Sequence, residues 1–216
     1  MIKNVLAIGA HPDDVEFGCS GTLLKHSKCG DNVTVLVMTI GESIDGVTGK
    51  ILRSQEELLR ETKTAAERMG VDLKFLDFQD LHVPFNFESV SGIDKVIQEL
   101  NIDVLYTHWA GDSNQDHIAT YKSSIAAARY VKNVYCYEQI PIPRHTENEM
   151  KCMLYNDITE VYDEKVHVVD SHFSQLKKYA AAGFDIQENL KILARYRGIQ
   201  AGVKYAEAFQ VIKTVS

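Results

Sequence analysis

The sequence predicts an α/β domain with a Rossmann-like, mostly parallel sheet and helices on both faces. Segments with the patterns of strands and of helices alternate along the chain. Expected strands such as 5–9 and 32–39 are apolar at consecutive positions, which is typical of parallel strands buried on both faces. With 216 residues, 45% of them hydrophobic, the chain fits a single domain, 1–216, with its own core.

The elements are expected in a regular order. The first strand, 5–9, ends at a glycine, and β-branched residues predict a second strand over 32–39. The Gly-rich segment 41–49 is expected to be a loop, and apolar spacing over 52–69 predicts an amphipathic helix that stops at Gly70. Further strands are expected at 73–76, 104–107, 134–137, 166–169 and 209–212. A helix is expected to end within 22–29, and further helices are expected at 90–100, 118–130, 171–182 and 187–198. The segment 141–149 is expected to be irregular.

Composition and charge exclude several classes of protein. The chain has 23 Lys and Arg residues against 30 Asp and Glu, a net charge of -7, which argues against a nucleic-acid or anionic-membrane partner. No apolar run reaches the roughly 18 residues of a membrane span. The first apolar run is too short for a signal peptide, so we expect a cytoplasmic protein. The four cysteines form no CxxC pair and are expected to be reduced thiols.

A first cluster of polar side chains directly follows the first expected strand. His11, Asp13 and Asp14 bring one imidazole and two adjacent carboxylates to the carboxyl edge of the sheet, where ligands bind in such folds. Neighbouring side chains diverge, so one carboxylate can hold a cation while the other faces a bound water. The alternative is a loop in which an aspartate caps the next helix.

A second cluster follows the fourth expected strand, at the same edge of the sheet. It contains Asp112, Asn114, Asp116 and His117, with His117 in the first turn of a helix. The alternative is that Asp112 or Asn114 caps this helix and that the histidine is an exposed polar residue. Two such clusters at one edge nevertheless favour a metal, because two histidines and an aspartate around an open position are a common catalytic zinc set.

These motifs resemble those of the PIG-L/LmbE-like family of zinc-dependent N-deacetylases, and the resemblance extends over nearly the whole chain. Segment 7–16 with its continuation 18–22 is similar to the first motif of the family, and 114–117 is similar to the second. Further similarities lie in 65–70, 193–198 and 202–209.

The resemblance implies a hydrolase that removes an N-acetyl group from an amino sugar, which is a sugar conjugate, a nucleotide sugar or a related metabolite. It implies Zn²⁺ as the cofactor, with His11, Asp14 and His117 as its ligands. Asp13 then corresponds to the general base that activates water. The resemblance also implies a homo-oligomer, because relatives often are oligomeric.

Some positions depart from the family pattern. Asn114 stands where many members have a histidine, so any stabilisation of the oxyanion by that histidine falls to an amide here. Leu58 stands where many members have an arginine, and Arg53, one or two turns earlier, is a candidate substrate contact. Asp112 and Asp116 are candidates for orienting the zinc imidazoles; the alternative is that they are solvated carboxylates at a helix start.

Other polar residues receive no single role. No role is assigned to Asp77, Asp80 and His82, which face the same edge of the sheet. His108 either lines the pocket or packs in the core, and His172 is expected on the surface or in the core.

Two other functions stay open. One is a metal-dependent hydrolase of an ester or phosphoester, which would release phosphate or an alcohol instead of an amine. The other is a non-catalytic metal-binding protein.

Overall fold

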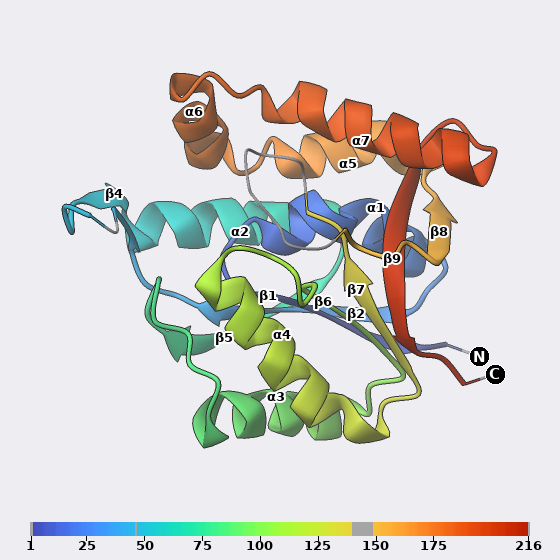
Figure 1. Ribbon diagram of the computed structural model, residues 1–216, viewed down its shortest axis with the longest axis horizontal. Coiled ribbons are helices and arrows are strands. Elements are labelled where there is room, and N and C mark those ends of the chain that lie inside the picture. The colour runs from blue at the N-terminus through green and yellow to red at the C-terminus, as the bar shows by residue number, and fades with distance from the viewer. Residues whose placement is uncertain (1, 46, 140–148, 216) are drawn as a thin grey trace.

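The computed structural model describes residues 2–45, 47–139 and 149–215. Its main sheet has seven strands in the order β5-β2-β1-β6-β7-β9-β8 (Figure 1). These strands are β1 (Asn4–Gly9), β2 (Asn32–Thr39), β5 (Asp72–Phe78), β6 (Val104–Thr107), β7 (Asn133–Tyr137), β8 (Leu154–Asp157) and β9 (Ala206–Lys213). A separate hairpin pairs β3 (Ser43–Ile44) with β4 (Ile51–Arg53). The helices are α1 (Asp14–Lys28), α2 (Gln55–Met69), α3 (Phe87–Leu100), α4 (Gln115–Ala127), α5 (Tyr162–Val169), α6 (Phe173–Ala181) and α7 (Ile186–Ala201).

The sheet is mostly parallel, as the sequence predicts. Strands β5, β2, β1, β6 and β7 are parallel, whereas β9 runs antiparallel to both β7 and β8. The central strand β1 buries Val5 and Ala7 in one core and Leu6 and Ile8 in the other, because successive side chains of a strand point to opposite faces.

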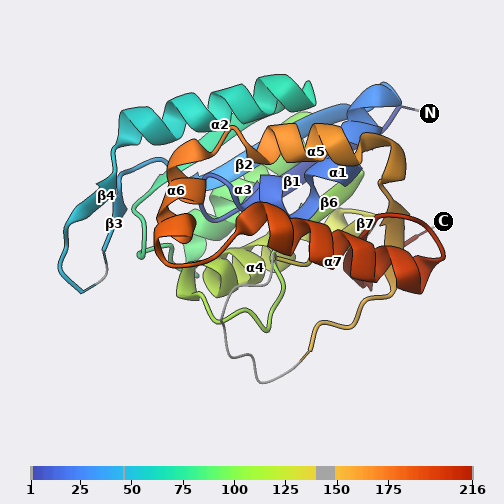
Figure 2. The same ribbon diagram turned by 90° about the horizontal axis from the view of Figure 1, so that it is seen from above.

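Helices cover both faces, which confirms the predicted α/β architecture. Helices α1 and α2 lie on one face with α5, α6 and α7 beyond them, and α3 and α4 lie on the other face (Figures 1 and 2). Among the residues that the structure describes, no helix combines the length and the apolar character that crossing a membrane requires.

Three expectations about local structure need correction. Residues 166–169 form the end of helix α5 and not a strand, because Lys165, Val168 and Val169 are buried at helical spacing. Strands β8 and β3 were not expected from the sequence, and β3 lies inside the segment 41–49 that was expected to be a loop. The helix expected from 52 begins at Gln55, because 51–53 pairs with β3 and Ser54 caps the helix by accepting from the Glu57 amide. Most of the expected irregular segment 141–149 lies outside the described residues.

Helix α1 is kinked at Cys19, whose φ of -145° and ψ of 16° are not helical. The buried carboxylate of Glu207 caps the second half of the helix: it accepts from the amides of Gly21 and Thr22 at 2.9 and 2.7 Å and from the Thr22 hydroxyl at 2.6 Å. The ammonium of Lys165 lies 2.5 Å from the same carboxylate and donates to the carbonyl of Phe17 at 3.0 Å. Strand β9 and helix α5 therefore fix the helix that carries the first polar cluster.

Candidate metal centre and active site

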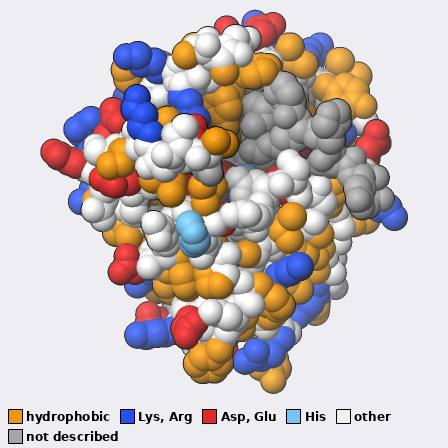
Figure 3. Space-filling view, turned by 60° about the vertical axis from the view of Figure 1, so that its left-hand side comes forward, with side chains coloured by type: hydrophobic (Ala, Val, Ile, Leu, Met, Phe, Trp, Pro, Cys, Tyr) orange, Lys and Arg blue, Asp and Glu red, His pale blue; other side chains and the backbone are white. Residues whose placement is uncertain are grey.

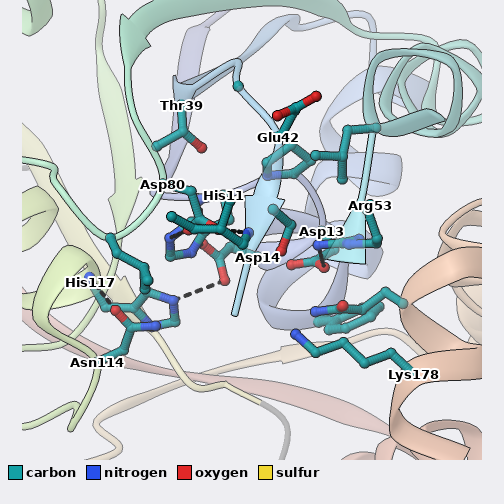
Figure 4. Close-up of a pocket in the computed structure, with 18 of the residues that line it drawn as sticks. His11, Asp13, Asp14, Thr39, Glu42, Arg53, Asp80, Asn114, His117 and Lys178 are labelled. Carbon is teal, nitrogen blue, oxygen red and sulfur yellow. Dashed lines mark hydrogen bonds and ion pairs between the residues drawn. The ribbon is translucent and has the colours of Figure 1, made fainter. Parts of the chain in front are cut away.

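Three side chains converge at the carboxyl edge of the sheet: His11 after β1, Asp14 at the start of α1 and His117 in the first turn of α4 (Figure 4). His117 Nε2 lies 3.1 Å from Asp14 Oδ1, and His11 Nδ1 lies 3.4 Å from Asp14 Oδ2. One ligand atom from each residue lies within 4.8 Å of the others. The geometry therefore brings together the two imidazoles and the carboxylate that the sequence singles out.

The orientation of His117 is set by two neighbours. Its Nδ1 lies 2.7 Å from Asp112 Oδ2, which leaves Nε2 to face Asp14. Asn114 caps α4, because its Oδ1 accepts from the amides of Asp116 and His117 at 2.8 and 3.4 Å. The capping alternative is thus correct for Asn114, but His117 is buried and not exposed.

His11 is held by two carboxylates on its other side. Its Nε2 lies 3.0 Å from Asp116 Oδ2 and 3.1 Å from Asp80 Oδ1, so Nδ1 is the nitrogen that faces Asp14. Asp116 itself accepts from the backbone amides of Leu81 and Val83 at 2.7 and 3.2 Å. The contact of Asp80 with His11 was not expected from the sequence, where only the position of Asp80 after β5, at the same edge of the sheet, pointed to it.

The electrostatics of this cluster fit a cation. Burial alone lowers the pKa of His11, but hydrogen bonds to Asp116, Asp14 and Asp80 outweigh it and raise the pKa well above its usual value. Burial raises the pKa of Asp14, but His117 and His108 outweigh it and hold that pKa well below its usual range. Positive charge is therefore stabilised here. Two imidazoles and one carboxylate are donors that zinc accepts, with room left for water.

His108 packs against this cluster on the side of the protein interior. It is fully buried, its Nε2 accepts from the Ala10 amide at 3.0 Å, and its ring stacks on that of His117 with the centroids 4.0 Å apart. Burial, followed by repulsion from His117, lowers its pKa to about 4. His108 is thus a buried residue that packs against His117, and it is not among the residues that line the cavity at this edge of the sheet.

Asp13 and Arg53 form the other half of the site (Figure 4). Asp13 has a φ of 108°, so its backbone turns away from the helix that begins at Asp14, and the two neighbouring carboxylates diverge. Its Oδ2 lies 3.6 Å from Arg53 Nη2 and accepts no hydrogen bond among the described residues. Burial, opposed by Arg53, raises the pKa of Asp13 to about 6. A carboxylate oxygen that accepts no hydrogen bond and lines a cavity can accept a proton.

These residues line a cavity of about 150 Å³. His11, Asp13, Asp14, Asn114 and His117 form its floor, at the carboxyl edge of the sheet. The walls come from Ser43 and Ile44 of β3, Arg53 of β4, Asp80 and Leu81 after β5, Gln175, Lys178 and Tyr179 of α6, and Ile186 of α7. Arg53 was expected from the sequence as a candidate substrate contact, whereas the residues of α6 and α7 were not connected with the site.

The model of the PIG-L family, described as GlcNAc-PI de-N-acetylase, matches residues 6–128, which include every polar side chain of the floor. The chain therefore belongs to the PIG-L family, and the resemblance of its motifs is confirmed. It is 33% identical over 141 residues to an uncharacterized deacetylase, YaiS, of Escherichia coli, with 63% of this chain and 74% of the relative covered. It is 26% identical over 231 residues to the diacetylchitobiose deacetylase of Thermococcus kodakarensis, with 98% and 84% covered.

The fold is shared with enzymes of more than one kind. The crystal structure of GalB, the 4-carboxy-2-hydroxymuconate hydratase of Pseudomonas putida, matches with a TM-score of 0.83 and 21% identity, and the match covers 100% of this chain and 98% of that one. At this identity the likeness concerns the fold. The curated relatives indicate an enzyme that hydrolyses N-acetyl groups, and the reaction must be argued from the site.

Proposed function

We propose that this protein is a zinc-dependent hydrolase that removes the N-acetyl group from an amino sugar, either a sugar conjugate, a nucleotide sugar or a related metabolite. The observation that carries the proposal is the proximity of His11, Asp14 and His117, whose ligand atoms lie within 4.8 Å of one another, with the unbonded Oδ2 of Asp13 nearby. The deacetylases among the relatives supply the reaction class. When bound, zinc supplies a Lewis acid that polarises the amide carbonyl and lowers the pKa of water.

The protein's own groups account for the proton transfers. Asp13 accepts a proton from the attacking water as the new C–O bond forms, and it returns this proton to the nitrogen as the C–N bond breaks. The products are acetate and the free amine. Arg53, at 3.6 Å, holds the Asp13 carboxylate and extends the pocket wall as a substrate contact.

Three further residues have supporting roles in this proposal. Asp112 and Asp116 fix the two imidazoles so that one nitrogen of each faces Asp14. The side-chain oxygen of Asn114 caps α4. Its side-chain NH₂ group therefore remains as a hydrogen-bond donor to the oxyanion of the substrate. This arrangement replaces the histidine that many family members have at that position.

The proposal includes a small-molecule partner, a cytoplasmic location and a homo-oligomer. Light scattering at micromolar concentration tests the last point, and a single species of 24.3 kDa would refute it. Fractionation of the native host tests the location.

Zinc-loaded protein incubated with a panel of N-acetylated amino sugars and their conjugates tests the reaction. We expect equal amounts of acetate and free amine from at least one compound. Matched O-acetyl esters and phosphate monoesters in the same panel test the other hydrolytic reactions. Elemental analysis of His117→Ala tests the metal set, and full zinc stoichiometry in that variant would contradict it. Zinc binding without any turnover would favour a non-catalytic protein.

A further inference from the structure

Gln139 is a polar side chain that lines the cavity and takes no part in the proposed proton transfers. It follows β7 at the carboxyl edge of the sheet and lies beyond residue 128, outside the part of the chain that the family model matches. The residue before it is fixed, because the carboxylate of Glu138 accepts two hydrogen bonds from the guanidinium of Arg197, one of them from Nε at 2.7 Å. The side chain of Gln139 therefore starts from a fixed point beside the cavity.

The side-chain amide of Gln139 has a defined orientation. Its Nε2 donates to the backbone carbonyl of Asp14 at 3.2 Å and to Asp14 Oδ1 at 3.4 Å. Both neighbours are oxygens that accept hydrogen bonds, so the nitrogen of the amide, and not its oxygen, must point toward Asp14. The oxygen Oε1 is left as an acceptor, and no donor among the described residues bonds to it.

Gln139 and the general base contact different sides of Asp14. The Asp14 oxygen that Gln139 approaches, Oδ1, is the one that faces His117, and Figure 4 shows His117 and Asp13 on opposite sides of Asp14. Asn114 offers a donor to the same cavity, because its side-chain oxygen is used to cap α4. One free donor and one free acceptor complement an acetamido group, which has one carbonyl oxygen and one N–H.

An acetyl ester of the same shape lacks this N–H, so the acceptor of Gln139 bears on the choice between the two bonds. Amide and ester are both uncharged, and the face of the molecule in Figure 3 carries basic and acidic side chains interspersed, so long-range electrostatics does not separate them. A site that bonds an N–H disfavours the analogue without it, because the acceptor of the site is then left unpaired. Selection of the amide must therefore come from a short-range contact.

We propose that Gln139 determines specificity for amides, with its Oε1 accepting the N–H of the acetamido group. The inference rests on the proposed function, because it places this group over His11, Asp14 and His117. With the N–H directed to Gln139, the lone pair that the nitrogen gains as the carbon becomes tetrahedral is free to face Asp13, which returns the proton there. Gln139 thus also positions the leaving nitrogen.

Two probes that differ at one position test the proposal: the methyl glycoside of N-acetylglucosamine, an amide, and methyl 2-O-acetylglucoside, the matching ester. Acetate release by the zinc-loaded protein, corrected for spontaneous hydrolysis, gives the amide-to-ester ratio of kcat/KM. Gln139→Met, which has no strong acceptor, should lower this ratio roughly tenfold. Gln139→Glu retains an acceptor oxygen and should largely keep the ratio. Gln98→Met is the matched control, because Gln98 is exposed on α3 and does not line the cavity.

The two variants separate recognition of the N–H from support of Asp14. Both lose the Nε2 donor, so a role limited to holding Asp14 would change the rates on both probes and leave their ratio unchanged. Elemental analysis checks that each variant binds zinc. An unchanged ratio in Gln139→Met would refute the proposal and leave the deacetylase standing, and an equal fall of the ratio in both variants would refute it as well.

Calorimetry of both probes separates this proposal from the proposed function. Tighter binding of the amide probe that is lost in Gln139→Met, without acetate release from any compound, would refute the deacetylase but support the role of Gln139. Hydrolysis of the ester alone by the unmodified protein would refute both. Neither binding nor turnover of the two probes would also count against both.

Discussion

The buried ion pair between Lys165 and Glu207 offers a sharp test of how α1 is held. Both residues are almost fully buried, and their charged atoms lie 2.5 Å apart. Replacing one partner of such a pair leaves the other charge buried without compensation, which costs about 3–5 kcal/mol. We therefore expect Lys165→Met and Glu207→Gln each to lower the free energy of unfolding by several kcal/mol.

The structure ranks the two variants. In Lys165→Met, Glu207 keeps three donors, namely two backbone amides and the Thr22 hydroxyl, so the loss should lie near 3 kcal/mol, the low end of that range. In Glu207→Gln, the buried ammonium of Lys165 loses its counter-charge, and the new amide NH₂ must face groups that are themselves donors, so the loss should lie near 4–5 kcal/mol, the high end. The double variant should lose less than the sum, because no charge is then left unpaired.

Urea unfolding at a fixed zinc concentration measures these losses. Lys28→Met is the matched control, since Lys28 pairs with Glu164 on the surface and both side chains are about half exposed. Its loss should stay below about 1 kcal/mol. A loss for Lys165→Met no larger than that of the control, or strictly additive single variants, would refute the view that this pair holds the helix.

Three more predictions concern the site and the thiols. Asp13→Asn should retain zinc but lower kcat by about 10²–10⁴-fold, whereas Asp14→Asn should lose zinc. Elemental analysis measures the bound zinc and initial rates measure kcat. The opposite pattern would mean that the two aspartates have each other's role. Asp112→Asn should weaken zinc binding by about 10–100-fold in a competition assay with a chelator, and an unchanged affinity would exclude it as an orienting group. At pH 8 a thiol reagent should rapidly modify Cys29, which is exposed, but not Cys136. Cys136 is buried, and burial raises its pKa to about 12. Rapid labelling of both cysteines in the native protein would contradict the buried position of Cys136.

The sequence was sufficient for the architecture and for the floor of the cavity, because both depend on local patterns. Parallel strands place their carboxyl ends at one edge, so the clusters after 5–9 and 104–107 were expected at the same edge, and the pairing of β1 with β6 makes them neighbours. The same local reasoning failed at 166–169, where three valines favour a strand but the burial of Lys165 on the same helix face favours a helix. Strand β8 gave little signal, because it is short and ends in Asn156 and Asp157.

Apart from Arg53, the residues of the cavity walls could not be assigned from local patterns. Asp80 was recognised only as a carboxylate near the correct edge, and its approach to His11 Nε2 depends on the loop after β5. Lys178 is 61 positions from His117 in the chain. A lysine on the polar face of an amphipathic helix is very common, so its position in the sequence does not indicate a site. Its place beside the cavity follows from the docking of α6 on α2 through Ser174 and Glu61.

The position of β9 between β7 and β8 affects the order in which the protein can assemble during synthesis. All the residues of the floor have been made once His117 has left the ribosome. The carboxylate that caps the second half of α1 belongs to Glu207, 186 positions after Gly21, and β8 has no strand to pair with until 206–213 arrives. Contacts this distant in sequence form late, because a long loop must close first. A nascent chain therefore carries the side chains of the candidate metal site well before the carboxylate that caps the second half of α1.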